Sequence, residues 1–143
     1  MPPRVPRRRA ATRGTDNACR EPDPECGPDF FTEFQHAGIL ANTGVVVTRN
    51  RLIGNQLGIY AFGTMETSHN TLIDNEYFGM ALQDGTFTAV KDTIRGGGDG
   101  VAVIASAIDT TAQLNQVRIT KVTGDRIRKF ECCGFTARVT TQP

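Results

Sequence analysis

The sequence predicts an all-β chain that winds as a right-handed parallel β-helix, a single solenoid of about four to five rungs. Two observations predict this fold class. The chain repeats itself every 20 to 24 residues, and apolar residues within each repeat come in short bursts that alternate with polar ones. Leucine-rich repeats have a similar length but need a dense leucine frame, which this sequence lacks.

Two markers define the repeat. The first is a Gly followed by Ile, Met or Val, at steps of 20, 21 and 21 residues: Gly38, Gly58, Gly79 and Gly100. A weaker fifth mark, Gly124, follows 24 residues later. The second marker runs about six residues ahead of the next glycine: Leu52, Leu72, Ile94 and Val117. Because the spacing of both markers increases along the chain in the same way, the markers indicate rungs that stack in register.

Each repeat holds about three strand-like bursts separated by Gly, Asn, Asp or Thr. Stacking the repeats predicts an inward aliphatic column: Ile39, Ile59, Met80 and Val101. A second inward column follows two residues later: Ala61, Leu82 and Val103. Residues 101–108 are the most apolar run, which indicates either a central strand whose outer face is also partly covered or a lateral loop that folds back.

Asparagine recurs at fixed places in the repeat. We expect Asn50 to stack on Asn70, and Asn55 on Asn75, because side-chain amides can donate and accept along a stack and Asn tolerates tight corners. In the next repeat Asp92 and Gly97 take about these places. We expect a carboxylate to end such an amide ladder poorly, since it cannot donate.

The repeated phrase has the form N-x-L-I-x-N-x-x-G-I. It occurs as NRLIGNQLGI and, with one extra residue, as NTLIDNEYFGM. In this phrase the chain resembles the pectate-lyase-like superfamily of parallel β-helix proteins, over roughly residues 30–130. The resemblance implies a secreted or cell-envelope protein that meets polysaccharide along one exposed sheet. The Asp-Asp and Gly-His-Gly signatures of that superfamily's hydrolases are not present.

Composition divides the chain into three parts. Residues 1–28 are Arg- and Pro-rich and predict a disordered basic tail and linker, residues 29–130 form the repeats, and residues 131–143 form a C-terminal strand or tail. An arginine-rich arm for nucleic acid is the alternative for the first part. The net charge of +1 favours no nucleic-acid partner.

No apolar run is long enough to predict a membrane span, and no signal peptide is visible. A short solenoid presents open strand edges, so we expect a fragment of a longer solenoid that can associate end to end.

The candidate catalytic residues are Asp84 and Asp99, since carboxylates on neighbouring rungs could supply an acid–base pair. Lys91, Asp92 and Arg95 are the candidates for binding a charged sugar. The alternative is that all five are ordinary turn residues facing solvent.

His69 is a further candidate base, although a histidine at a solenoid corner more often bonds locally. Cys19 and Cys26 could close a small loop or remain thiols, and a disulfide between the adjacent Cys132 and Cys133 would be unusual. The Cys and His spacing matches no zinc pattern, so we expect neither a metal nor a cofactor.

Three functions follow from these patterns. The first is a non-catalytic β-helix module that contacts carbohydrate or acts as a scaffold. The second is a lyase, epimerase or hydrolase of uronate-containing polysaccharide. Metal handling, as in periplasmic copper-processing β-helix proteins, is the third, and three Met and two His give it little support.

Overall fold

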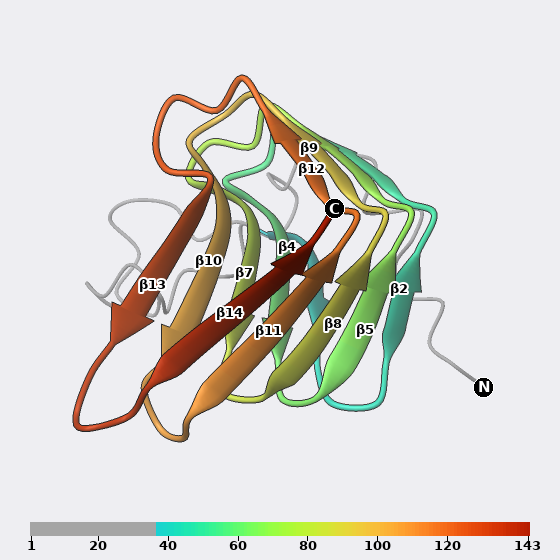
Figure 1. Cartoon of the computed structure of the whole chain (residues 1–143). Helices are drawn as coiled ribbons and strands as arrows, with labels where there is room; N and C mark the ends of the chain where they lie inside the picture. Colours follow the sequence, from blue (N-terminus) through green and yellow to red (C-terminus); the bar gives the residue numbers. More distant parts are fainter. Residues whose placement is uncertain (1–36) are drawn as a thin grey trace, which may run out of the picture.

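The computed structural model describes residues 37–143, which are all-β and contain no helix. One parallel sheet, here called sheet A, holds five strands in the order β1 (Ala37–Ala41), β4 (Leu57–Phe62), β7 (Phe78–Gln83), β10 (Asp99–Ala105) and β13 (Ile127–Glu131). Successive strands of sheet A are separated in sequence by two other strands, so the chain leaves the sheet and returns one level higher each time (Figure 1).

The intervening strands form two more parallel sheets. Sheet B holds β2 (Val46–Thr48), β5 (Met65–Ser68), β8 (Thr86–Val90), β11 (Thr110–Asn115) and β14 (Ala137–Gln142). Sheet C holds β3 (Arg51–Ile53), β6 (Thr71–Ile73), β9 (Thr93–Arg95) and β12 (Arg118–Thr120). Each turn of the coil therefore contributes one strand to each sheet, and β13 and β14 begin a further turn. This architecture is a parallel β-solenoid, which confirms the predicted fold class.

The strand register confirms the first column of inward residues. Ile39 pairs with Ile59, Ile59 with Met80, and Met80 with Val101. Leu52, Leu72 and Ile94 pair in the same way in sheet C. The last turn differs from the prediction, because Ile119 rather than Val117 pairs with Ile94 and Arg126, not Gly124, precedes the residue that pairs with Val101.

The solenoid interior is apolar and closely packed. Its largest side chains are completely or almost completely buried: Leu52, Ile59, Leu72, Met80, Leu82, Ile94, Val101 and Val103. Burying a large aliphatic side chain contributes about 1.5–3 kcal/mol, so this column of side chains is the main source of stability.

The predicted asparagine ladder is present. The Asn70 side-chain oxygen accepts hydrogen bonds from the Asn50 backbone N–H at 2.9 Å and from its side-chain amide at 3.1 Å. The Asn75 side chain bonds Asn55 in the same way, at 3.0 and 3.4 Å. All four asparagines are buried, so the ladder satisfies backbone groups at the corners where no strand partner is available.

Asp92 ends the first ladder. One carboxylate oxygen accepts from the Asn70 backbone N–H at 2.8 Å and the Asn70 amide at 2.9 Å, and the other accepts from the Thr67 hydroxyl at 2.6 Å. The carboxylate thus supplies the acceptors that the terminal position needs, and the expectation that it ends the ladder poorly stays a prediction.

Candidate functional site: the outer face of sheet A

The outer face of sheet A carries a second apolar cluster, separate from the solenoid interior. In β10, Val101 and Val103 belong to the interior, whereas Ala102 and Ile104 belong to the second cluster. The same alternation places Tyr60 on the outer face of β4. All seven residues of β10 are buried, so both faces of this strand are covered, which agrees with the central strand and not with the lateral loop for residues 101–105.

Aromatic rings give the outer face its shape. Tyr60 and Phe62 stack with ring centroids 4.5 Å apart, and Phe78 meets Phe130 edge-on at 5.9 Å. The Arg128 guanidinium lies over the Phe130 ring, 4.9 Å from its centroid. Tyr60 and Phe78 are buried, whereas Phe62 and Phe130 are only partly buried. The accessible aromatic surface therefore lies at the rim of the cluster.

A row of polar groups borders this rim, where the strands of sheet A end. The Tyr60 hydroxyl donates a hydrogen bond to the Gln83 side-chain oxygen. The Gln83 amide donates to the Ser106 hydroxyl at 3.0 Å and to the Asp84 carboxylate at 3.3 Å. Gln83 therefore connects Tyr60 to Asp84. The row is thus a connected network and not a set of independent surface groups.

Asp84 holds the turn of the next rung in place. Its carboxylate accepts from the backbone N–H of Ser106 at 2.8 Å, from the Ser106 hydroxyl at 2.8 Å and from the Ala107 N–H at 2.9 Å. Partial burial would raise the pKa of Asp84, but these hydrogen bonds outweigh it and the pKa lies below the ordinary value. Asp84 is therefore a carboxylate at neutral pH and is unsuited to act as a general acid.

Asp99 lies at the other end of sheet A. Its carboxylate accepts from the Asp125 backbone N–H at 2.7 Å and pairs with Arg128 at 3.3 Å. Asp99 stands beside Phe78 in the register, six residues before Asp84 on the neighbouring strand, which corresponds to about 20 Å. Glycosidase carboxylates stand about 5–9.5 Å apart, so the structure does not bring this predicted catalytic pair together.

The three predicted sugar-binding residues lie elsewhere on the coil. Lys91 and Asp92 occupy the corner between sheets B and C, and Arg95 ends β9 in sheet C. Lys91 and Arg95 are exposed, whereas Asp92 is fully buried and bonded to the ladder. The five predicted site residues thus lie at separate places on two successive rungs and do not surround a common groove.

Burial raises the pKa of Asp92 above the ordinary value, although the hydrogen bonds from Thr67 and Asn70 and the nearby His69 oppose the shift. His69 itself is exposed at the same corner, with a left-handed backbone at φ 55°. Asp92 is therefore a structural acceptor, and a role for His69 as a base stays a prediction.

Cys132 and Cys133 form a disulfide, although a disulfide between adjacent cysteines is unusual. Cys19 and Cys26, with the rest of residues 1–36, lie outside the described residues. Within residues 37–143, no group of three or more His, Cys, Asp or Glu side chains could hold a metal ion. No helix in that same range is long and apolar enough to cross a membrane.

Comparison with known proteins gives no relative. The chain matches no family model, no curated protein and no solved structure. The class that the fold defines is the parallel β-solenoid, and the likeness to the pectate-lyase-like superfamily depends on the repeated phrase alone.

Sequence reasoning missed the residues of the rim. Phe62, Gln83 and Phe130 lie in one column of the outer face, on either side of Ile104. The signal for two of them was in the sequence: once Ala61 and Leu82 are assigned to the interior, the next residues, Phe62 and Gln83, must face outward.

Proposed function

We propose that the chain is a non-catalytic β-solenoid module, part of a secreted or cell-envelope protein, that contacts polysaccharide at the rim of sheet A, where Phe62, Gln83 and Phe130 are partly exposed. The observation that carries this proposal is the column formed by Phe62, Gln83, Ile104 and Phe130. With rungs about 4.8 Å apart along the solenoid axis, it places a partly exposed phenyl ring at each end, three rungs apart, and the Gln83 amide on the rung after Phe62.

The chemistry of this column suits a sugar chain. Aromatic side chains present a large flat apolar surface with little conformational entropy to lose, which suits the apolar faces of sugar rings. Gln83 supplies an amide, and Arg128 supplies a guanidinium whose side chain is 51% exposed. Because a guanidinium pairs with carboxylates, a uronate-containing polymer is the preferred ligand.

The carboxylates argue for contact without catalysis. Asp84, Asp92 and Asp99 each accept backbone N–H hydrogen bonds from a neighbouring part of the coil. Each is already bonded to the fold, and no two of them share a site with room for a sugar ring between them. The lyase, epimerase or hydrolase alternative needs such a pair.

The Cys132–Cys133 disulfide supports the proposed location, since disulfides persist mainly in oxidising compartments outside the cytosol.

Affinity electrophoresis of the purified full chain in gels containing alginate, pectin or neutral dextran tests the proposal. We expect retardation by the uronate polymers, and no release of unsaturated or reducing ends from any of them. Arg128→Gln should reduce the retardation, because Arg128 faces the contact column. Lys129→Gln, which removes the same charge one residue later and on the opposite face of β13, should not.

Two results would contradict the proposal. Equal mobility in all gels would remove polysaccharide as a partner. Turnover by the wild-type chain that is abolished in Asp84→Asn or Asp99→Asn would establish the enzyme alternative.

A further inference from the structure

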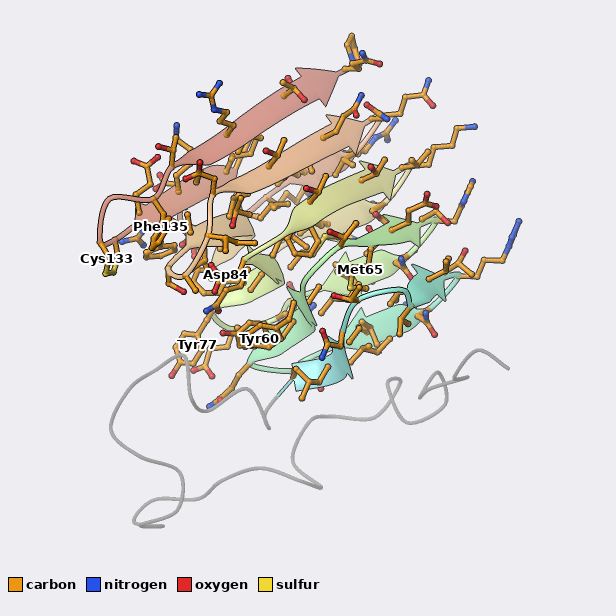
Figure 2. All side chains as sticks on the ribbon, turned by 90° about the horizontal axis from the view of Figure 1, so that it is seen from below. Tyr60, Met65, Tyr77, Asp84, Cys133 and Phe135 are labelled. Carbon is orange, nitrogen blue, oxygen red and sulfur yellow. A yellow bond between two sulfur atoms is a disulfide. The ribbon has the colours of Figure 1, made fainter. Side chains whose placement is uncertain are left out.

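The turn that joins β13 to β14 carries two exposed, adjacent cysteines. Cys132 and Cys133 are linked by a disulfide, with their Cα atoms 3.7 Å apart. Figure 2 shows Cys133 at the periphery of the molecule, beside Phe135. We propose that this pair is a reversible thiol–disulfide exchange site that reacts with small thiols and small disulfides in solution.

The backbone of the turn depends on the pair. The Phe135 N–H donates to the Cys132 carbonyl at 3.1 Å, which closes a four-residue turn. The two central residues, Cys133 and Gly134, have φ of 64° and 89°, as in a type I′ turn. Gly adopts this conformation readily, but an L-residue such as Cys133 does so at a cost. The disulfide ring joins Cys133 to its neighbour and so helps to hold it there.

The surroundings confine any change to the turn itself. The Cys132 N–H donates to the Ala105 carbonyl at 3.0 Å, which fixes the start of the turn on the rung below. After the turn, the Thr136 N–H donates to the Asp109 carboxylate and the Ala137 N–H to Glu131, at 2.9 and 2.8 Å. Opening the disulfide therefore frees Cys133 and Gly134 while the strands on both sides stay anchored.

The exchange is chemically balanced. The thiolate of a small thiol attacks one cysteine sulfur, the S–S bond breaks, and its electron pair leaves with the other cysteine as a thiolate. A second small thiol attacks the mixed disulfide and releases the small disulfide. The net reaction converts one protein disulfide and two small thiols into two protein thiols and one small disulfide, and a small disulfide drives the reverse.

Proximity of the two cysteines favours the closed disulfide over a mixed disulfide with a small thiol. Once one cysteine carries a mixed disulfide, its neighbour is always within reach, so closure of the ring competes strongly with a second external thiol. Exposure on the turn gives the external thiol access to the sulfurs. We therefore expect the doubly reduced and the closed forms to dominate, with little mixed disulfide.

The test uses the full chain with Cys19→Ser and Cys26→Ser, so that Cys132 and Cys133 are the only cysteines that can be alkylated. Folded protein is equilibrated in mixtures of reduced and oxidised glutathione, alkylated with iodoacetamide and analysed by mass spectrometry. We expect a reversible change between zero and two alkyl groups. Phenylarsine oxide, which binds two thiols with loss of one water, should bind the reduced form one to one.

Two variants keep the test decisive. Cys133→Gly suits the positive φ, so it should preserve the turn while abolishing arsenical binding and the two-group change. Cys133→Ser should abolish both reactions as well. The proposal is overturned if the disulfide resists excess reduced glutathione until the protein is unfolded in urea, or if the reduced pair does not close in oxidised glutathione. Amide NMR shifts that spread on reduction beyond residues 132–136 would also contradict it.

Discussion

Replacing Asn70 by alanine is the most informative test of the ladder. The side chain is 1% exposed and makes four hydrogen bonds: it accepts two from Asn50 and donates to the Val47 carbonyl and the Asp92 carboxylate, both at 2.9 Å. Alanine removes all four. It leaves the Asn50 backbone N–H, which is buried, without its acceptor.

The expected loss follows from these partners. A buried polar group left without a partner costs about 1–3 kcal/mol, and Asn70→Ala removes the side-chain partner of both the Asn50 backbone N–H and the Val47 carbonyl. Asp92 keeps two of its three donors, so its share is the smaller one. We expect Asn70→Ala to lower the free energy of unfolding by about 3 kcal/mol, a large fraction of the roughly 5–15 kcal/mol typical of a domain.

Urea unfolding followed by far-UV circular dichroism measures this change. With a slope of about 1.5 kcal/mol per molar urea, the midpoint should fall by roughly 2 M with the slope unchanged. Asn75→Ala is the matched control. Its bonds to Asn55 and Leu52 are 3.0–3.4 Å long and the next rung offers only Gly97 in place of a carboxylate, so its loss should be smaller. Equal stability of Asn70→Ala and wild type would refute the reasoning.

Three further predictions concern single positions. Asp92→Asn should be more stable than wild type at neutral pH. Because the pKa of Asp92 is raised in the folded protein, wild type loses stability as pH rises through that pKa, and the advantage of the variant should shrink as pH falls towards 3.8. Urea unfolding of both proteins at pH 3.5 and pH 7 measures this difference. Asp84→Asn should lower the free energy of unfolding by about 1 kcal/mol at pH 7. Because the pKa of Asp84 is lowered in the folded protein, the carboxylate stabilises the fold above pH 3.8, and the difference between variant and wild type should fade as pH falls below 3.8. A difference that does not depend on pH would contradict this. Gly58→Ala should cost about 1–3 kcal/mol, because its Cβ would lie 2.4 Å from the Gly79 carbonyl oxygen. Gly54→Asn should cost less in thermal unfolding, because nothing lies within 4 Å of the added Cβ and Asn tolerates the left-handed backbone of Gly54, at φ +72°.

The sequence was sufficient to predict the repeating part of the fold. Inward residues such as Ile59 and Met80 must recur at the rung period because stacked rungs bury the same positions. The ladder was equally predictable, since Asn50 and Asn70 serve the same corner of adjacent rungs. The last turn of the coil was predicted wrongly because the connection between β10 and β11 is longer than the corresponding connection between β7 and β8. Without the glycine marker, nothing local distinguishes Val117 from Ile119 as the partner of Ile94.

The candidate site was much less predictable. Acidic residues in turns attract attention in a sequence, but whether they face a ligand or the backbone depends on contacts between rungs more than 20 residues apart. Asp84 is an example, because its donors lie on Ser106 and Ala107, one rung later. The predicted pairing of Asp84 with Asp99 ignored the direction of the strands, which places the two residues at opposite ends of sheet A.

The central claim is that equivalent residues of successive repeats lie directly over one another. Nuclear Overhauser effects between methyl groups of the full-length chain test it most directly. The account predicts contacts from Leu52 to Leu72 and from Leu72 to Ile94, with none directly from Leu52 to Ile94, because one rung separates them. A direct Leu52–Ile94 contact, or no contact between Leu52 and Leu72, would contradict the stacked solenoid.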